Sequence, residues 1–342
     1  MKALVFHGIN QIDLEDRDEP DDPKETEVIV RTAYCGICGS DLTALRTGNY
    51  VPNTVIGHEC SGRVVRVGNK VTKVRLGDRV VCSSIVPCGS CSYCLNGRPE
   101  LCENAMMIGI SVDGGMADLV KVPEKAIFTI PEGLDLLTAS LAEPLAIVLH
   151  SINIASSPLG KTVLVQGAGP IGLLEELALN HAGASKIMIT DISSRRLSLA
   201  KDLLPSVDIV NPISDNVFSY IERITNGNGV DLIFDTTGSS KAIESDFTLV
   251  KRGGKIIIVG IPEEISGADF FTTVLNEISI YGSYEGYNEM PTALTLLSNP
   301  EIPWRKIITS VLTIDSAVRD GFMKLLREPA EGKVSVSLGG DI

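Results

Sequence analysis

The stretch Thr162–Gly183, TVLVQGAGPIGLLEELALNHAG, joins an apolar run to a glycine-rich turn and then to a longer apolar pattern. The run TVLVQ is typical of a buried strand, and the spacing of leucines after the turn is typical of a helix. Isolated G-x-G-x-x-G motifs are weak evidence, but between a strand and a helix the motif indicates dinucleotide binding. The stretch therefore predicts the first strand and helix of a doubly wound parallel sheet.

Each residue of the turn has an expected role. Gly167 permits the tight turn, Gly169 lets a pyrophosphate approach the backbone, and Gly172 allows the helix to pack closely on the strand. Pro170 and Ile171 open the helix, whose positively polarised N-terminus is expected to hold the phosphates. We therefore expect these residues to bind a dinucleotide.

Asp191 ends the next predicted strand, KIMITD, nineteen residues after Gly172. A carboxylate at this place accepts hydrogen bonds from the adenosine ribose of NAD and repels the 2′-phosphate of NADP. Arg195 and Arg196 are weak evidence against a preference for NAD, because arginines at this place can bind the 2′-phosphate of NADP. The sequence favours NAD.

The composition excludes several classes of protein. The 342 residues are 44% hydrophobic and 21% charged, with a formal net charge of −13. An acidic chain repels phosphate backbones and anionic membranes, so we expect neither nucleic acid nor membrane as a partner. The first apolar run is too short for a signal peptide, and no stretch approaches the roughly 20 apolar residues that cross a bilayer. These features predict a cytoplasmic protein with reduced thiols.

The chain changes its pattern near residue 150, which predicts two domains. Residues 1–150 contain short strand patterns separated by glycine turns, typical of a small barrel or sandwich. Residues 151–283 alternate six strand patterns with helices, which predicts a Rossmann-type sheet. We expect residues 284–342 to return to the first domain. The predicted fold class is α/β, with a β-rich domain and a doubly wound domain.

Four cysteines lie within fifteen residues, CGSCSYCLNGRPELC, in a loop rich in glycine and proline. A disulfide is disfavoured in a reducing compartment, and a redox C-x-x-C motif needs only two cysteines; an iron–sulfur cluster is a further alternative. The spacing suits tetrahedral coordination of one zinc ion, with no position left for substrate. We expect a structural zinc bound by Cys88, Cys91, Cys94 and Cys102.

A second set of metal-ligand residues lies in the β-rich part. It comprises Cys38 in CGICGSD, His58 and Glu59 in GHECSG, and Glu143 in AEPL. Sulfur, imidazole and carboxylate are ligands of catalytic zinc sites that keep one position open. Spacing alone leaves a second interpretation, in which these residues are hydrogen-bonded parts of the framework.

The text GHECSGRVVRVGNKVTKVRLGDRVV resembles the signature of the zinc-dependent medium-chain alcohol dehydrogenase family. CGICGSD, the four-cysteine loop, AEPL and GAGPIG follow in that family's order, over essentially the whole chain. The chain looks most similar to the branch that holds sorbitol and other polyol dehydrogenases, L-threonine dehydrogenase and galactitol-phosphate dehydrogenase. The resemblance implies a GroES-like catalytic domain, a Rossmann domain, NAD, and both a catalytic and a structural zinc in each chain.

The resemblance also implies roles for single residues. Cys38, His58 and Glu59 match the protein ligands of the catalytic zinc. The residue that matches Glu143 lies close by, where it orients a water molecule or exchanges onto the metal.

Three further residues match family positions, each with a plainer alternative. Ser40 matches a relay hydroxyl, or is a loop serine. Asp41 matches the carboxylate that holds the second ring nitrogen of His58, or is a helix-capping acid. Arg196 matches an arginine beside the adenine, or is a surface charge. Many relatives have histidine where this chain has Thr43, so the relay must end in water or another group.

The implied reaction is oxidation of a secondary hydroxyl of a polyol, sugar or related diol, with hydride transfer to NAD. An L-threonine-like amino alcohol and a sugar-alcohol phosphate are alternative substrates. The alternatives outside enzymology are an idle NAD-binding protein and a zinc-dependent nucleic-acid binder. Polyol-type relatives are commonly tetramers, so we expect a homo-oligomer, and a tetramer before a dimer.

Overall fold

Two parts of the chain pack separately in the computed structural model, which describes residues 1–262, 264, 267–329 and 332–339. The first unit comprises Met1–Ala146 and Gly286–Ile342, and the second comprises Ile147–Glu285. The expected boundaries after residues 150 and 283 lie close to these limits. Residues 330–331 and 340–342 of the expected return segment lie outside the described residues.

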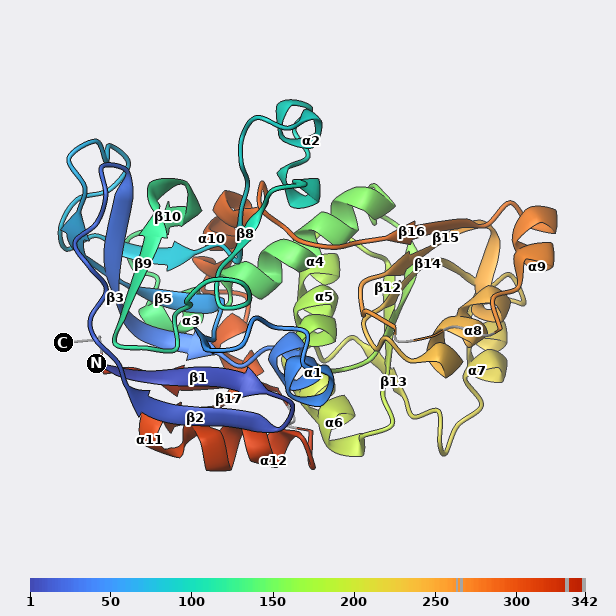
Figure 1. Cartoon of the computed structure of the whole chain (residues 1–342). Coiled ribbons are helices and arrows are strands. Elements are labelled where there is room, and N and C mark those ends of the chain that lie inside the picture. The colour runs from blue at the N-terminus through green and yellow to red at the C-terminus, as the bar shows by residue number, and fades with distance from the viewer. Residues whose placement is uncertain (263, 265–266, 330–331, 340–342) are drawn as a thin grey trace. The chain divides into compact units, whose positions relative to one another are not determined.

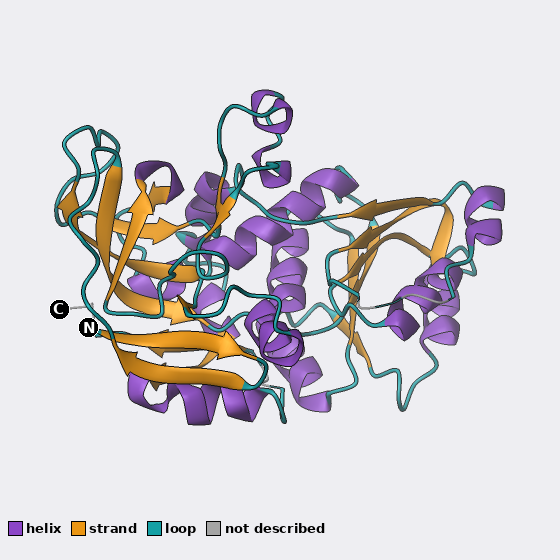
Figure 2. Ribbon diagram, in the orientation of Figure 1, coloured by secondary structure: helices purple, strands orange, loops and turns teal. Residues whose placement is uncertain are grey.

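The first unit is mostly β-structure (Figures 1 and 2). Its strands are β1 (Lys2–Gly8), β2 (Gln11–Asp16), β3 (Glu27–Gly36), β4 (Thr54–Val55), β5 (Glu59–Val67), β6 (Arg79–Cys82), β7 (Ile85–Val86), β8 (Met106–Met107), β9 (Leu119–Pro123), β10 (Ile127–Thr129), β17 (Ile308–Thr313) and β18 (Lys333–Ser337). Its helices are α1 (Gly39–Thr47), α2 (Ser92–Leu95), η1 (Pro99–Leu101), η2 (Glu124–Ala126), α3 (Leu136–Ala139), α10 (Met290–Leu297), η3 (Trp304–Ile307), α11 (Ile314–Ser316), η4 (Ala317–Phe322) and α12 (Met323–Leu325).

The largest sheet of this unit runs β10-β6-β5-β3-β18-β17, and β9 also pairs with β3. The smaller sheets are β2-β1-β4 and β7-β8. Strand β3 is central, and its buried valines pack in one core cluster with Val334 and Val336 of β18. The pairing register places Gly36 of β3 opposite Glu59 on one side and Ser335 on the other. This register brings the end of the chain next to the predicted metal ligands.

The second unit is a parallel sheet with helices on both faces. Its strands are β11 (Thr162–Gln166), β12 (Lys186–Thr190), β13 (Asp208–Val210), β14 (Val230–Asp235), β15 (Val250–Ile258) and β16 (Ser279–Gly282). Its helices are α5 (Pro170–His181), α6 (Ser194–Leu203), α7 (Val217–Thr225), α8 (Ser240–Leu249) and α9 (Phe270–Leu275), and α4 (Ala142–Ala155) leads into it.

The strand order is β13-β12-β11-β14-β15-β16, and every pair is parallel. Figure 1 shows α5 and α6 on one face and α7 and α8 on the other. The order reverses between β11 and β14, which is where ligands bind in sheets of this kind. The predicted α/β fold class, with a β-rich part and a doubly wound part, is confirmed.

Helix α5 carries two acidic side chains that are fully buried, Glu175 and Glu176. Oγ of Ser151 lies 3.2 and 3.1 Å from the two carboxyl oxygens of Glu175. Neither carboxyl oxygen of Glu176 has a hydrogen-bond partner among the described residues. Burial raises the pKa of Glu175 well above its usual range and raises the pKa of Glu176 to about 9. Glu176 is therefore neutral at pH 7.

We predict that Glu176 makes the second unit less stable as the pH rises. A carboxyl whose pKa is raised by folding contributes stability that is fully present below its usual pKa and is lost as the pH approaches about 9. The loss is at most about 1.4 kcal/mol per pH unit. Glu176→Gln cannot ionise, so its melting temperature should depend less on pH than that of the wild type. Exposed Glu222 of α7 offers a control, Glu222→Gln. Parallel pH profiles for wild type and Glu176→Gln would contradict the prediction.

Candidate metal centre and cofactor turn

Cys38, His58 and Glu59 converge in the first unit. One ligand atom from each lies within 4.8 Å of the other two. Cys38 caps the N-terminus of α1, and Glu59 begins β5. Of the three, only Cys38 is partly exposed. The two motifs CGICGSD and GHECSG are thus brought to one place by the start of a helix and the start of a strand.

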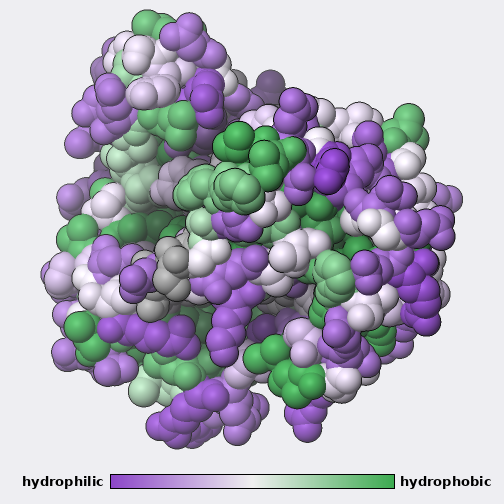
Figure 3. Space-filling view, turned by 90° about the vertical axis from the view of Figure 1, so that its right-hand side faces the viewer, coloured by the Kyte–Doolittle hydropathy of each residue, from purple (hydrophilic) through white to green (hydrophobic). Residues whose placement is uncertain are grey.

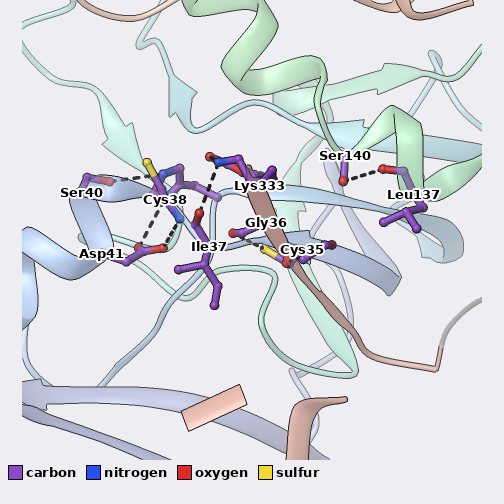
Figure 4. A network of polar contacts seen from close by, with 12 residues as sticks. Cys35, Gly36, Ile37, Cys38, Ser40, Asp41, Leu137, Ser140 and Lys333 are labelled. Atoms are coloured by element: carbon purple, nitrogen blue, oxygen red, sulfur yellow. Dashed lines mark hydrogen bonds and ion pairs between the residues drawn. The ribbon is translucent and has the colours of Figure 1, made fainter. Parts of the chain in front are cut away.

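The carboxylate of Glu59 is buried and only half satisfied. Nζ of Lys333 donates to Oε1 of Glu59 at 2.6 Å. It also donates to the carbonyl of Ile37 at 3.2 Å (Figure 4). Oε2 of Glu59 has no hydrogen-bond partner among the described residues. A Cβ atom at Gly36 would overlap this oxygen, so the glycine leaves room for it. A bound cation would satisfy Oε2, so this donor set fits a metal ion.

The electrostatics of the set favour a cation. Burial opposes a charge on His58, but the charges of Cys38 and Asp41 outweigh it and raise the pKa of the imidazole well above its usual range. Burial likewise opposes the charge of Lys333, yet Glu59 and Cys38 raise its pKa. The negative groups that stabilise a proton here would also stabilise a divalent ion.

Asp41 caps the start of α1 and lies near the ring of His58. Its Oδ2 accepts a hydrogen bond from the backbone of Cys38 at 2.9 Å, which closes the first turn of α1. Its Oδ1 lies 3.8 Å from Nδ1 of His58, an ion-pair distance too long for a hydrogen bond. Figure 4 shows Asp41 and Ser40 beside Cys38. Oγ of Ser40 lies 3.5 Å from the other ring nitrogen, Nε2, so the two side chains flank the imidazole.

Glu143 lies in the first turn of α4 and is buried. It is not one of the three residues whose ligand atoms lie within 4.8 Å of one another. Its charge nevertheless raises the pKa of both His58 and Lys333. Glu143 thus lies within electrostatic reach of His58 and Lys333.

Two residues of this region have no signal in the sequence. Lys333 follows a short return segment and belongs to no motif. Tyr50 follows the end of α1, and its hydroxyl lies 2.8 Å from Oγ of Ser40 and 3.2 Å from Oδ1 of Asp41. Only the long-range pairing of strands and the course of a loop bring these residues to the site.

The four-cysteine loop forms a second cluster, around α2. The Sγ atoms are 3.5 Å apart for Cys91 and Cys94, and 3.9 Å apart for Cys88 and Cys94 and for Cys91 and Cys102. A tetrahedron with zinc–sulfur bonds of about 2.3 Å has edges of about 3.8 Å, so the spacing fits zinc. The backbone N–H of Ser90 is the main cause that lowers the pKa of Cys88, to about 5. All four cysteines are free of disulfides.

The glycine-rich turn lies between β11 and α5, as predicted. Gly167 has a φ of +95°, and its N–H donates to the carbonyl of Thr190 at 2.8 Å. A Cβ at Gly172 would overlap the carbonyl of Gly167, which explains the close packing of helix and strand. Gly169 caps α5, and Pro170 and Ile171 begin it. The open N-terminus of this helix is a suitable site for phosphate.

Asp191 is more constrained than the sequence indicates. Its two oxygens accept hydrogen bonds from the backbone of Ala168 at 2.9 Å and of Ser193 at 2.7 Å. Nη1 of Arg196 lies 3.6 Å from Oδ2 of Asp191. Each carboxylate oxygen can accept a second hydrogen bond, so Asp191 keeps capacity for a ribose. Arg196 lies at the turn and pairs with Asp191.

Comparisons with known proteins agree with this geometry. Residues 24–132 match the alcohol dehydrogenase GroES-like domain, and residues 170–299 match the zinc-binding dehydrogenase family. The sorbitol dehydrogenase of Bacillus subtilis is 33% identical, with 92% of this chain and 91% of the relative covered. The crystal structure of 2R,3R-butanediol dehydrogenase from Bacillus subtilis is 29% identical and superposes with a TM-score of 0.90, covering 98% of this chain and 99% of that one.

A third comparison concerns the cofactor. A zinc-binding dehydrogenase from Sinorhizobium meliloti, solved with NADP bound, is 29% identical, with a TM-score of 0.89 and 98% of each chain covered. The sequence relationship extends over both units, and so does the structural one. With its clustered metal-ligand residues and its dinucleotide turn, this chain belongs to the zinc-type medium-chain alcohol dehydrogenase family.

Proposed function

We propose that the chain oxidises a secondary hydroxyl of a polyol, sugar or related diol and transfers hydride to NAD. The observation that carries this proposal is the cluster of thiol, imidazole and carboxylate formed by Cys38, His58 and Glu59. Oε2 of Glu59 is buried and has no hydrogen-bond partner among the described residues, so a cation could bind to it. The likeness to a sorbitol dehydrogenase and to a butanediol dehydrogenase supports the substrate class.

Two zinc ions per chain are part of the proposal. Cys38, His58 and Glu59 would hold one, which would polarise the substrate oxygen as a Lewis acid. Cys88, Cys91, Cys94 and Cys102 would hold the other in a closed site that stabilises the loop. The sulfur spacing in the loop supports the second assignment.

The side chains around the first set would orient the substrate. Oγ of Ser40, partly exposed beside the ring of His58, would accept a hydrogen bond from the reacting hydroxyl. Asp41 would hold the ring of His58 through Nδ1. Glu143, within electrostatic reach of His58, would accept a hydrogen bond from a water molecule or from a second hydroxyl of the substrate.

The charges favour a neutral substrate that carries two neighbouring hydroxyls. Glu59 and Glu143 are acidic, and the lysine described in this cluster, Lys333, is already paired with Glu59. A phosphate ester would therefore meet repulsion, whereas a diol offers one oxygen to the metal and a neighbouring one to Glu143. An L-threonine-like amino alcohol remains the second candidate, because an ammonium group also suits an acidic site.

NAD is the proposed cofactor, held by Gly167, Gly169, Pro170, Ile171 and Gly172 through its pyrophosphate. Asp191 would accept from the ribose, and Arg196 would lie beside the adenine. The NADP bound in the relative from Sinorhizobium meliloti makes this preference worth testing.

A homo-oligomer is also proposed, and a tetramer before a dimer. Four large apolar side chains of α9, Phe270, Phe271, Val274 and Leu275, are exposed, and β16 lies at an edge of the sheet. Figure 3 looks onto this part of the second unit and shows apolar surface there. Exposed apolar patches of this kind mark contact surfaces. A cytoplasmic location remains an expectation from composition; among the described helices, none is long and apolar enough to cross a membrane.

We predict that Asp191 decides between the cofactors. The wild type should prefer NAD over NADP in kcat/KM by at least about tenfold, or about 1.4 kcal/mol. Asp191→Ser should narrow this ratio, because it removes the repulsion of the 2′-phosphate and leaves Arg195 and Arg196 in place. Asp208→Ser, which breaks the ion pair of Asp208 with Lys186 in the same sheet, is the matched control. An unchanged ratio in Asp191→Ser would show that another residue discriminates.

Steady-state kinetics on matched substrates test the proposed reaction. With NAD, kcat/KM should be at least about tenfold higher for 2,3-butanediol than for 2-butanol. This ratio corresponds to the free energy of the one or two hydrogen bonds that the second hydroxyl of the diol adds. It should also be higher for a sugar alcohol than for its phosphate ester. A clear preference for the simple alcohol, the phosphate ester or L-threonine would refute the assigned substrate class.

A further inference from the structure

Tyr50 forms a hydrogen-bonded bridge behind Ser40. Its hydroxyl lies 2.8 Å from Oγ of Ser40 and 3.2 Å from Oδ1 of Asp41. The side chain is 4% exposed, and its ring packs edge-on against Phe6 with centroids 5.9 Å apart. Packing thus holds the phenol in place, so its oxygen has one position relative to Ser40.

The hydrogens of this bridge can be assigned by counting donors. The phenolic hydroxyl of Tyr50 is the donor in both contacts, to Oγ of Ser40 and to Oδ1 of Asp41. The contact with Ser40 is the shorter of the two, so the single phenolic hydrogen lies mainly between Tyr50 and Ser40. Oγ of Ser40 accepts this hydrogen, and it keeps its own hydrogen and one further lone pair. Burial, followed by the charge of Asp41, raises the pKa of Tyr50 well above its usual range, so the phenol keeps its hydrogen.

This arrangement determines which way Ser40 is turned. With one lone pair of Oγ occupied by the hydrogen of Tyr50, the remaining lone pair and the hydrogen of Ser40 point away from the buried phenol. Ser40 is partly exposed, and Oγ lies 3.5 Å from Nε2 of His58. The remaining lone pair and the hydrogen of Ser40 are therefore available on the open side of the predicted metal ligands, where a substrate hydroxyl would lie.

We propose that Tyr50 is a positioning residue that holds the Ser40 hydroxyl in place as the hydrogen-bond partner of the substrate hydroxyl. The proposal rests on the function proposed above. In this proposal the hydrogen-bond partner of Ser40 on its buried side is Tyr50, a tyrosine of the loop after α1. Position 43, where many relatives have histidine, is threonine in this chain. Tyr50 touches neither substrate nor cofactor and acts through Ser40.

The test compares Tyr50→Phe with Tyr287→Phe. Both variants remove one phenolic oxygen, since the hydroxyl of Tyr287 donates to the carbonyl of Lys125, also at 2.8 Å. With NAD and sorbitol or 2,3-butanediol, Tyr50→Phe should lower kcat about tenfold or more, with KM changed by less than about threefold, and with its metal content unchanged. Tyr287→Phe should match the wild type. A kcat of Tyr50→Phe within about twofold of that control would overturn the proposal.

A second measurement needs no turnover. The chain has seven tyrosines, so protein labelled with carbon-13 at the tyrosine ζ carbon should give few signals, and the one lost in Tyr50→Phe identifies Tyr50. Ser40→Ala should shift this signal, because the phenolic hydroxyl loses the acceptor of its shorter hydrogen bond. An unmoved signal would overturn the proposal even if the enzyme is active. If the signal shifts but the wild type oxidises no alcohol, the proposed function fails, and the role of Tyr50 in it fails too, while the contact stands.

Discussion

The buried carboxylate of Glu59 is the constraint on which the candidate metal site depends. A charge in the protein interior costs several kcal/mol unless opposite charge and hydrogen bonds compensate it. Lys333 compensates one oxygen from the opposite end of the chain, and Gly36 leaves space for the other. A cation beside Oε2 would complete the compensation and connect Glu59 with Cys38 and His58.

This constraint links the local motifs to the global topology. Lys333 reaches Glu59 only because β18 pairs with β3, which in turn pairs with β5. The segment that follows the Rossmann-type sheet must therefore return to the first unit. Removing one partner of such a buried pair typically costs about 3–5 kcal/mol, since the other charge stays buried. The need to compensate the buried charge of Glu59 thus accounts for the pairing of β18 with β3, for the glycine at residue 36 and for the predicted binding of a metal ion.

The parts of the structure that have local sequence patterns were predictable. The run TVLVQGAGPIG specifies strand, turn and helix by itself, and the two ligand sets stand in short motifs with the spacing of metal sites. Strand β18 and Lys333 were not predictable as a site, because a pairing between β3 and the end of the chain has no local pattern. Tyr50 has none either, since its role comes from the course of a loop.

Three acidic residues show a different limit of prediction from sequence. Charged residues in a helix are normally expected on its exposed face, yet Glu175 and Glu176 are fully buried in α5. The carboxylate of Asp191 was expected to accept hydrogen bonds from the ribose, but the backbone N–H groups of Ala168 and Ser193 already donate to its two oxygens. Side-chain burial and competition by the backbone are tertiary properties, which residue type and spacing do not contain.

Zinc content measured by plasma mass spectrometry tests the central claim most directly. The account predicts two zinc ions per chain in the wild type and about one in Gly36→Ala, because a methyl group at residue 36 displaces the carboxylate of Glu59. Gly39→Ala should keep both ions, since a Cβ there meets no atom within 4 Å. Melting curves would show whether each variant remains folded. Two zinc ions in a folded Gly36→Ala, or a single ion in the wild type that Cys38→Ser leaves in place, would contradict the account.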